Sequence, residues 1–207
     1  MKNFDNSFLS NKIKLICGVD EAGRGPLAGP VVAASVLFDS DTDIPRINDS
    51  KKLSSKLREE LFIEITQKAL AYRVSIVDER DIDKINILQA TLKAMKQSVE
   101  ELTIKPDLIL IDGNKSFYSK TPVKTIVKGD SKSHAIAAAS ILAKVSRDKL
   151  MINAAEKYPL YFWEKNKGYG TKQHIEAIKK IGPCTMHRKT FLSNIIEQKE
   201  LEIIFGR

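Results

Sequence analysis

The 207-residue chain has 43% hydrophobic residues and a formal net charge of +8, values typical of one globular domain with an adequate core. No apolar run approaches the roughly 18 residues that a membrane span needs, and the N-terminal segment lacks the apolar core of a secretion signal. We therefore expect a cytoplasmic protein. Cys17 and Cys184 lie far apart without CxxC spacing, which predicts neither a zinc site nor a disulfide framework.

The positive charge is concentrated in the C-terminal half. Residues 1–112 hold 16 Lys and Arg against 18 Asp and Glu, a net charge of −2, whereas residues 113–207 hold 18 against 8, a net charge of +10. This asymmetry favours a polyanionic partner, of which nucleic acid is the commonest. A basic protein can also simply be soluble, so charge alone leaves nucleic-acid binding undecided.

The first part of the chain predicts two strands, a helix and a third strand. The β-branched runs at 14–19 and 31–38 are separated by a glycine loop and predict a hairpin. Ser54 is expected to cap a helix. Its apolar residues share one face, namely Leu57, Leu61, Phe62 and Ile65. A third strand is predicted at 71–77.

The next helix has the clearest pattern in the chain. Apolar residues recur alternately every three and four positions and predict a continuous stripe: Ile85, Leu88, Leu92, Met95, Val99 and Leu102. Pro106 ends this helix, and the run at 107–112 predicts a short strand buried on both faces. A fifth strand at 123–128 leads through Gly129-Asp130 into a helix. The small residues of that helix are expected to pack closely on the sheet: Ala135, Ala138, Ala139 and Leu142.

These elements predict an α/β domain. The first three of its five strands would be antiparallel, and the later two would be joined through helices. From about residue 151 the pattern is helical, with interruptions by loops rich in Gly, Lys and His.

Four carboxylates are expected at the ends of strands. Asp20 and Glu21 close the first strand, Asp112 closes the fourth, and Asp130 closes the fifth. Ligands of open α/β sheets bind at the carboxyl ends of strands, so these acids are expected to converge if the strands are neighbours. Converging carboxylates repel one another, and a hard cation with oxygen ligands, Mg²⁺ or Mn²⁺, is the natural partner.

A structural interpretation competes with this one. Asp at a strand end often caps a turn, and that is the ordinary interpretation of any one of these places. The three places together favour a site. Adjacent side chains of a strand point to opposite faces, so a bulge or the strand's end is expected to let Asp20 and Glu21 reach one site.

The glycine loop at 23–29 does not fit a dinucleotide-binding motif. Its spacing is GxGxxxG, and it leads into a strand where that motif needs a helix. Gly23 and Gly25 instead offer backbone that a ligand can approach closely, and Arg24 between them is suited to a phosphate.

Six ordered motifs together resemble bacterial ribonuclease HII, a type 2 ribonuclease H. They are GVDEAGRGPLAGPVVAA, NDSKKLS, NILQAT, LIDGN, VKGDSKSHAIAAASILAKVSRD and KGYGTKQH. The resemblance extends from about Ile16 to Phe191. It implies one catalytic domain over 1–207, with a ribonuclease H-like core at about 12–150. A helical C-terminal segment at about 151–207 would contribute to substrate binding.

The resemblance implies that Asp20, Glu21, Asp112 and Asp130 are the catalytic, metal-binding carboxylates. Two ions, Mg²⁺ or Mn²⁺, would act in the substrate complex, one activating water and the other stabilising the leaving 3′ oxygen. The implied activity is hydrolysis of RNA in RNA–DNA hybrids and nicking 5′ to a single ribonucleotide in duplex DNA. The products would carry 5′-phosphate and 3′-hydroxyl ends. No membrane partner and no small-molecule cofactor is expected, and a monomer suffices.

The resemblance also implies how RNA is selected. The backbone of Gly23, Arg24 and Gly25 would sense the 2′-hydroxyl, which distinguishes RNA from DNA, and Tyr169 would stack on the next deoxynucleotide sugar. Lys52 and Lys144 are expected to contact phosphate or the site. Either lysine could as well be solvated. No role is assigned to the histidines, His134, His174 and His187.

Two alternatives remain at this point. One is a metal-dependent DNA nuclease or strand-transfer enzyme on the same fold, against which the Gly-Arg-Gly loop and Tyr169 argue. The other is a nucleic-acid-binding module without catalysis. Carboxylates facing a polyanion weaken binding unless metal occupies them, so the four acids argue against that module.

Overall fold

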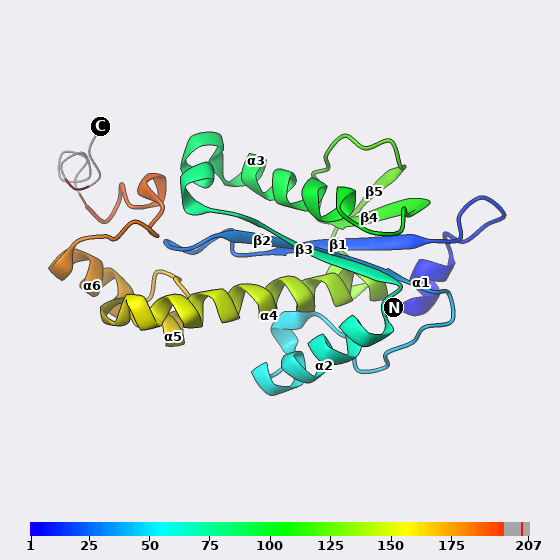
Figure 1. The fold of residues 1–207 in the computed structure, drawn as a ribbon, viewed down its shortest axis with the longest axis horizontal. Helices are drawn as coiled ribbons and strands as arrows, with labels where there is room; N and C mark the ends of the chain where they lie inside the picture. The colour runs from blue at the N-terminus through cyan, green and yellow to red at the C-terminus, as the bar shows by residue number, and fades with distance from the viewer. Residues whose placement is uncertain (197–203, 205–207) are drawn as a thin grey trace.

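The computed structural model describes residues 1–196 and 204. A five-stranded sheet forms the middle layer, with α3 on one face and α4 on the other, and α2 packs against α4 (Figure 1). The strands are β1 (Ile16–Ala22), β2 (Val31–Phe38), β3 (Ala71–Val77), β4 (Leu108–Asp112) and β5 (Val123–Ile126). The helices are α1 (Lys2–Asn6), α2 (Ser55–Lys68), α3 (Glu79–Glu100), α4 (His134–Lys157), α5 (Trp163–Asn166) and α6 (Lys172–Ile181). Within the described residues, none of these helices combines the length and apolar character that crossing a bilayer requires.

The strand order is β3-β2-β1-β4-β5. β1, β2 and β3 pair antiparallel, whereas β4 pairs parallel with both β1 and β5. The predicted mixed sheet is therefore confirmed. The expected helix between β4 and β5 was wrong, because residues 113–122 form a loop without one. β5 is so short that an extended segment of this length can return along it, at roughly 3.3 Å per residue.

Helix α3 differs from its prediction near its start. Asn86 has a φ of 64° and a ψ of 164°, outside the helical range, and kinks the helix. Its Oδ1 accepts hydrogen bonds from the backbone N–H groups of Leu88 and Gln89, which begins the second helical part. The apolar stripe is consequently not continuous: Leu88 is only half-buried, whereas Met95 is buried.

The predicted small face of α4 is confirmed. A Cβ placed on Gly18 of β1 would lie 2.1 Å from the carbonyl carbon of Ala135, so helix and sheet are in backbone contact. α4 is one helix of 24 residues that runs through residue 150, the expected boundary of the core. The C-terminal segment therefore begins within α4, a helix of the core. Its end, residues 197–203 and 205–207, lies outside the described residues.

The N-cap predicted for α2 is confirmed, since the Ser54 side chain accepts a hydrogen bond from the N–H of Leu57 at 3.2 Å. Replacing Ser54 by Ala leaves that N–H without its acceptor. We expect the free energy of unfolding to fall by about 1 kcal/mol, measured by urea denaturation. Ser54→Asp should keep most of the stability, because Asp also caps helices; equal losses in both variants would contradict the cap.

Candidate active site

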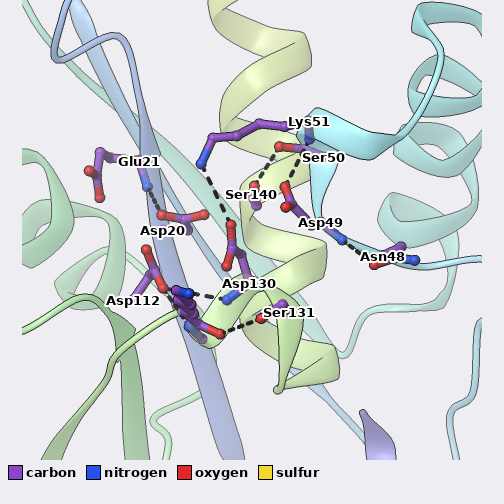
Figure 2. Close-up of polar contacts among 12 residues, drawn as sticks. Asp20, Glu21, Asn48, Asp49, Ser50, Lys51, Asp112, Asp130, Ser131 and Ser140 are labelled. Atoms are coloured by element: carbon purple, nitrogen blue, oxygen red, sulfur yellow. Dashed lines mark hydrogen bonds and ion pairs between the residues drawn. The ribbon is translucent and has the colours of Figure 1, made fainter.

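Three acids meet where β1 and β4 stop pairing. The last pair of that parallel ladder is Val19 with Ile111, so Asp20 and Asp112 follow it side by side. The Oδ1 of Asp112 accepts hydrogen bonds from the N–H of Gly129 at 2.6 Å and of Asp130 at 3.4 Å. Figure 2 shows the side chains of Asp20, Asp112 and Asp130 directed toward one another.

Two details of the predicted acids were wrong. Asp20 and Glu21 lie within β1, regularly paired with Ala34 and Ala33 of β2, so neither a bulge nor the strand's end brings them together. Neighbouring side chains leave a strand on opposite sides, but the Glu21 carboxylate still lies close enough to interact with the carboxylates of Asp20 and Asp112. Asp130 lies beyond β5, in a short 3₁₀ turn.

The pKa values of Asp20, Glu21 and Asp130 are raised. Burial raises the pKa of Asp20 well above 3.8, and the nearby charges of Glu21 and Asp112 add to the effect. Burial also raises the pKa of Glu21, against the opposing effect of Arg24, with which it forms an ion pair at 3.5 Å. A divalent cation placed among these carboxylates would favour their ionised forms and offset the repulsion.

The donors fit a divalent cation of the hard type. All are carboxylate oxygens, the ligands that Mg²⁺ and Mn²⁺ prefer. Among residues 1–196 and 204, no three Asp, Glu, His or Cys side chains form a ready-made ligand cluster. Asp20, Asp112 and Asp130, with Glu21, are the residues that would hold the ion.

The Gly-Arg-Gly loop and Tyr169 lie against each other, as a common role requires. A Cβ placed on Gly25 would be 4.0 Å from Cε1 of Tyr169, whose side chain is 43% exposed. The Nζ of Lys144 lies 5.9 Å from the centre of the Tyr169 ring and forms an ion pair with Asp148 at 2.8 Å. The structure thus places three of the predicted substrate-binding residues together.

The loop is tied to the C-terminal segment by backbone hydrogen bonds. The N–H of Leu27 donates to the carbonyl of Gly168, and the N–H of Gly29 donates to that of Met186, each at 2.8 Å. The residues around Tyr169 therefore set the position of the glycine loop.

Relatives of the chain point to one family. The family model of ribonuclease HII matches residues 17–194. A ribonuclease HII of Endomicrobium trichonymphae is 55% identical over 204 residues, which are 97% of each chain. One of Caldicellulosiruptor bescii is 53% identical over 192 residues, 93% of each. The chain belongs to the ribonuclease HII family.

A solved structure agrees with this ribonuclease HII assignment. The ribonuclease H2 of Pyrococcus horikoshii OT3 has a TM-score of 0.73 and 28% identity, over 93% of this chain and 99% of that one. The family resemblance and the ribonuclease H-like fold predicted from the sequence are confirmed.

Lys51 of this ribonuclease HII chain lies beside the predicted carboxylates, whereas the sequence predicted a contact for its neighbour Lys52. Its Nζ lies 3.7 Å from the Oδ2 of Asp130 (Figure 2). Burial opposes the charge of Lys51, but the surrounding carboxylates, Asp130 foremost, outweigh it and raise the pKa of Lys51. Lys51 and Lys52 are both exposed, and the contact of Lys52 with substrate stays a prediction. The motif NDSKKLS contained the signal of a lysine near the acids, although not which lysine lies beside Asp130.

The histidines of this ribonuclease HII chain lie apart from the carboxylates. The Nε2 of His134 accepts a hydrogen bond from the N–H of Ile44. The Nδ1 of His174 lies 2.9 Å from the carbonyl of Tyr169, so it must donate. Its Nε2 accepts from the Nε1–H of Trp163 at 3.0 Å and lies 3.1 Å from the Nε2 of His187. The Nδ1 of His187 accepts from the N–H of Cys184, a free cysteine like Cys17.

Acid should weaken the fold through this histidine pair. Burial, reinforced by His174, lowers the pKa of His187 to about 3, whereas the unfolded value is 6.5. Below pH 6.5 His187 is protonated in the unfolded chain but stays neutral in the folded chain. The stabilisation is complete above pH 6.5 and is lost as the pH falls toward 3.

We therefore expect His187 to account for a loss of about 2 kcal/mol in unfolding free energy between pH 7 and pH 5, measured by urea denaturation over a pH series. His187→Asn keeps an acceptor for the N–H of Cys184 but does not titrate, so its pH profile should be flatter. Parallel profiles for the two proteins would contradict the assignment.

Proposed function

We propose that this chain is an endoribonuclease that hydrolyses the RNA strand of RNA–DNA hybrids and nicks duplex DNA on the 5′ side of single embedded ribonucleotides. The observation that supports it most is one arrangement of side chains. Asp20, Asp112 and Asp130 converge beside a Gly-Arg-Gly loop that lies against the exposed ring of Tyr169. The proposed enzyme works as a cytoplasmic monomer.

The acids would hold divalent metal. Bound there, Mg²⁺ or Mn²⁺ would supply an activated water and stabilise the leaving oxygen. Through the metal that they would hold, Asp20 and Asp112 would orient the sugar-phosphate backbone of the substrate. Asp112 also fixes the turn of Asp130 through its hydrogen bond from Gly129. No protein nucleophile is needed, and the products carry 5′-phosphate and 3′-hydroxyl ends.

The neighbouring loop would provide the preference for RNA. Backbone groups of Gly23, Arg24 and Gly25 can approach the 2′-hydroxyl because two of these residues have no side chain. The ring of Tyr169 is exposed for stacking on the following sugar. Lys144 beside that ring, with Lys51 or Lys52, supplies positive charge for phosphate, which adds affinity without base specificity.

The basic C-terminal segment would extend the contact with the duplex. α6 carries Lys172, Lys179 and Lys180, all exposed, and the loop before it holds Tyr169. Contacts of this kind release counterions, so affinity should fall steeply as salt rises.

The proposal is tested by cleavage of end-labelled duplexes in Mg²⁺, Mn²⁺ and EDTA. The substrates are a DNA duplex with one ribonucleotide, an all-DNA duplex and an RNA–DNA hybrid. A metal-dependent nick 5′ to the ribonucleotide, with all-DNA intact, is the expected result. Equal cutting of all-DNA would indicate a general nuclease. Binding without cutting of any duplex would favour a binding module.

A further inference from the structure

Two buried arginines lie behind the glycine loop, outside the set of residues predicted from the sequence. Arg147 of α4 is 1% exposed and Arg188 is 0% exposed. The guanidinium of Arg147 donates from Nε to the carbonyl of Pro30 at 2.9 Å and from Nη2 to that of Ala28 at 3.0 Å. Its Nη1 donates to the carbonyl of Lys167 at 3.0 Å, which joins the loop to the segment before Tyr169.

Arg188 binds the other part of the same loop. Its guanidinium donates to four loop carbonyls, those of Gly23 (2.6 Å), Arg24 (2.9 Å), Gly29 (2.9 Å) and Pro30 (3.2 Å). Its own backbone N–H donates to the carbonyl of Leu27 at 2.9 Å. Five of the eight carbonyls from Gly23 to Pro30 are therefore bound from behind by one of two cations.

These contacts replace ion pairs. Within the described residues, no carboxylate lies within ion-pair distance of either guanidinium. A buried charge is costly unless its donors are satisfied, and here backbone carbonyls satisfy them. The planar, forked guanidinium can bind several carbonyls in fixed directions, which a lysine ammonium cannot do.

The direction of the carbonyls sets the direction of the N–H groups. In a trans peptide the C=O and N–H point to opposite sides, and no cis peptide bond occurs in the part of the chain that the structure describes. Because the carbonyls of Gly23 and Arg24 point inward to Arg188, the N–H groups of Arg24 and Gly25 point outward. Neither N–H forms a hydrogen bond within the described residues. Bonding of the carbonyls to a cation also polarises these peptides and strengthens their N–H groups as donors.

We propose that Arg147 and Arg188 are positioning residues for ribonucleotide recognition: they hold the loop by its carbonyls so that the N–H groups of Arg24 and Gly25 face the sugar and phosphate of the substrate. This inference rests on the proposed function. Arg147 and Arg188 would thus control the discrimination between ribose and deoxyribose without having to touch the substrate.

The test compares the full-length wild type with Arg188→Lys and Arg147→Lys, which keep the charge and lose the fork. Single-turnover cleavage of the one-ribonucleotide duplex is measured in Mg²⁺ well below each variant's Tm. Affinities for that duplex and for all-DNA are measured in EDTA. We expect the cleavage rate of Arg188→Lys to fall roughly 10-fold to 100-fold, its ribo-to-deoxy affinity ratio to approach one, and its all-DNA affinity to stay unchanged. Arg147→Lys should show the same pattern more weakly.

Two controls separate positioning from stability. Arg73→Lys makes the same chemical change at an exposed ion pair with Glu101 and should behave as wild type. Leu61→Ala weakens the core beneath α2 and should lower Tm without changing the affinity ratio. If Arg188→Lys keeps the wild-type rate and ratio while losing only Tm, the proposal is overturned. It is likewise overturned if neither lysine variant folds by circular dichroism, because the arginines would then be structural. Failure of the wild type itself to cut at the ribonucleotide would instead remove the proposed function.

Discussion

Replacing Asp20 by Asn is expected to slow cleavage of a ribonucleotide-containing duplex by roughly 1,000-fold or more. Asn has the same shape but lacks the charge that a divalent ion requires. The same loss of charge weakens repulsion of the phosphate chain, so affinity for the duplex should be unchanged or tighter. Single-turnover kinetics and fluorescence anisotropy measure the two effects separately.

A second readout of the Asp20→Asn protein does not depend on activity. Burial and neighbouring acids raise the pKa of Asp20, which means that the folded chain disfavours its charge. In EDTA at neutral pH the Asn variant should therefore melt at a higher temperature than the wild type. In Mg²⁺ this difference should shrink, because the ion relieves the same repulsion in the wild type.

The matched control for Asp20→Asn is Asp107→Asn, which lies just before the opposite end of the sheet's β4. Asp107 is half-buried, and its carboxylate accepts hydrogen bonds from the N–H groups of Lys14 and Leu15 at 2.9 Å. Its substitution should leave cleavage unaffected. If Asp20→Asn cleaves within a few-fold of the wild type, the assignment of these carboxylates to catalysis is wrong.

Gly23→Ala is expected to cost about 4 kcal/mol of unfolding free energy and most of the cleavage activity. Gly23 has a φ of +98°, which L side chains rarely adopt, and its Cβ would lie 2.0 Å from Nε of Arg147 and 2.8 Å from the carbonyl oxygen of Pro30. Neither neighbour can move freely, because Arg147 is buried and bonded to that carbonyl. Chemical denaturation and the cleavage assay measure the two losses.

Gly182→Ala separates backbone strain from the steric clash. Gly182 also has a positive φ, +76°, but its Cβ would meet nothing closer than 4.0 Å. Its substitution should cost only the conformational strain, about 1 kcal/mol, and should not affect cleavage. Equal losses at the two glycines would mean that the contact with Arg147 is unimportant.

Local patterns in the sequence were sufficient for much of the fold. β-branched runs predicted the strands, and Ser54 predicted the start of α2, because strand and cap preferences depend on neighbours a few residues away. The face of small residues with which α4 packs on the sheet was also predicted, because these residues follow one another at helical spacing within a short stretch. The kink at Asn86 was missed, since the helical period of the apolar residues continues on both sides of it.

The candidate site also contains features that local sequence patterns do not predict. That Asp20, Asp112 and Asp130 could meet followed from their places after apolar strands, and the family motifs supported it. That Asp20 and Glu21 lie in β1 without a bulge depends on the regular pairing of β1 with β2, which a strand's own sequence does not specify. The choice of Lys51 over Lys52 depends likewise on how the turn packs on α4, through the contact of Ser50 with Ser140 at 2.7 Å.

The family, the sheet and the acids could therefore be inferred from the chain alone, because each leaves a signal within a short stretch of residues. The contacts of the arginines behind the glycine loop leave none, although Arg147 itself lies within one of the six motifs. Arg188 binds the carbonyl of Gly23 across a separation of 165 residues, and a backbone carbonyl has no sequence identity that a motif could reveal. Only folding brings that carbonyl to the guanidinium of Arg188. The hydrogen bonds formed there offset the otherwise unfavourable burial of the charge.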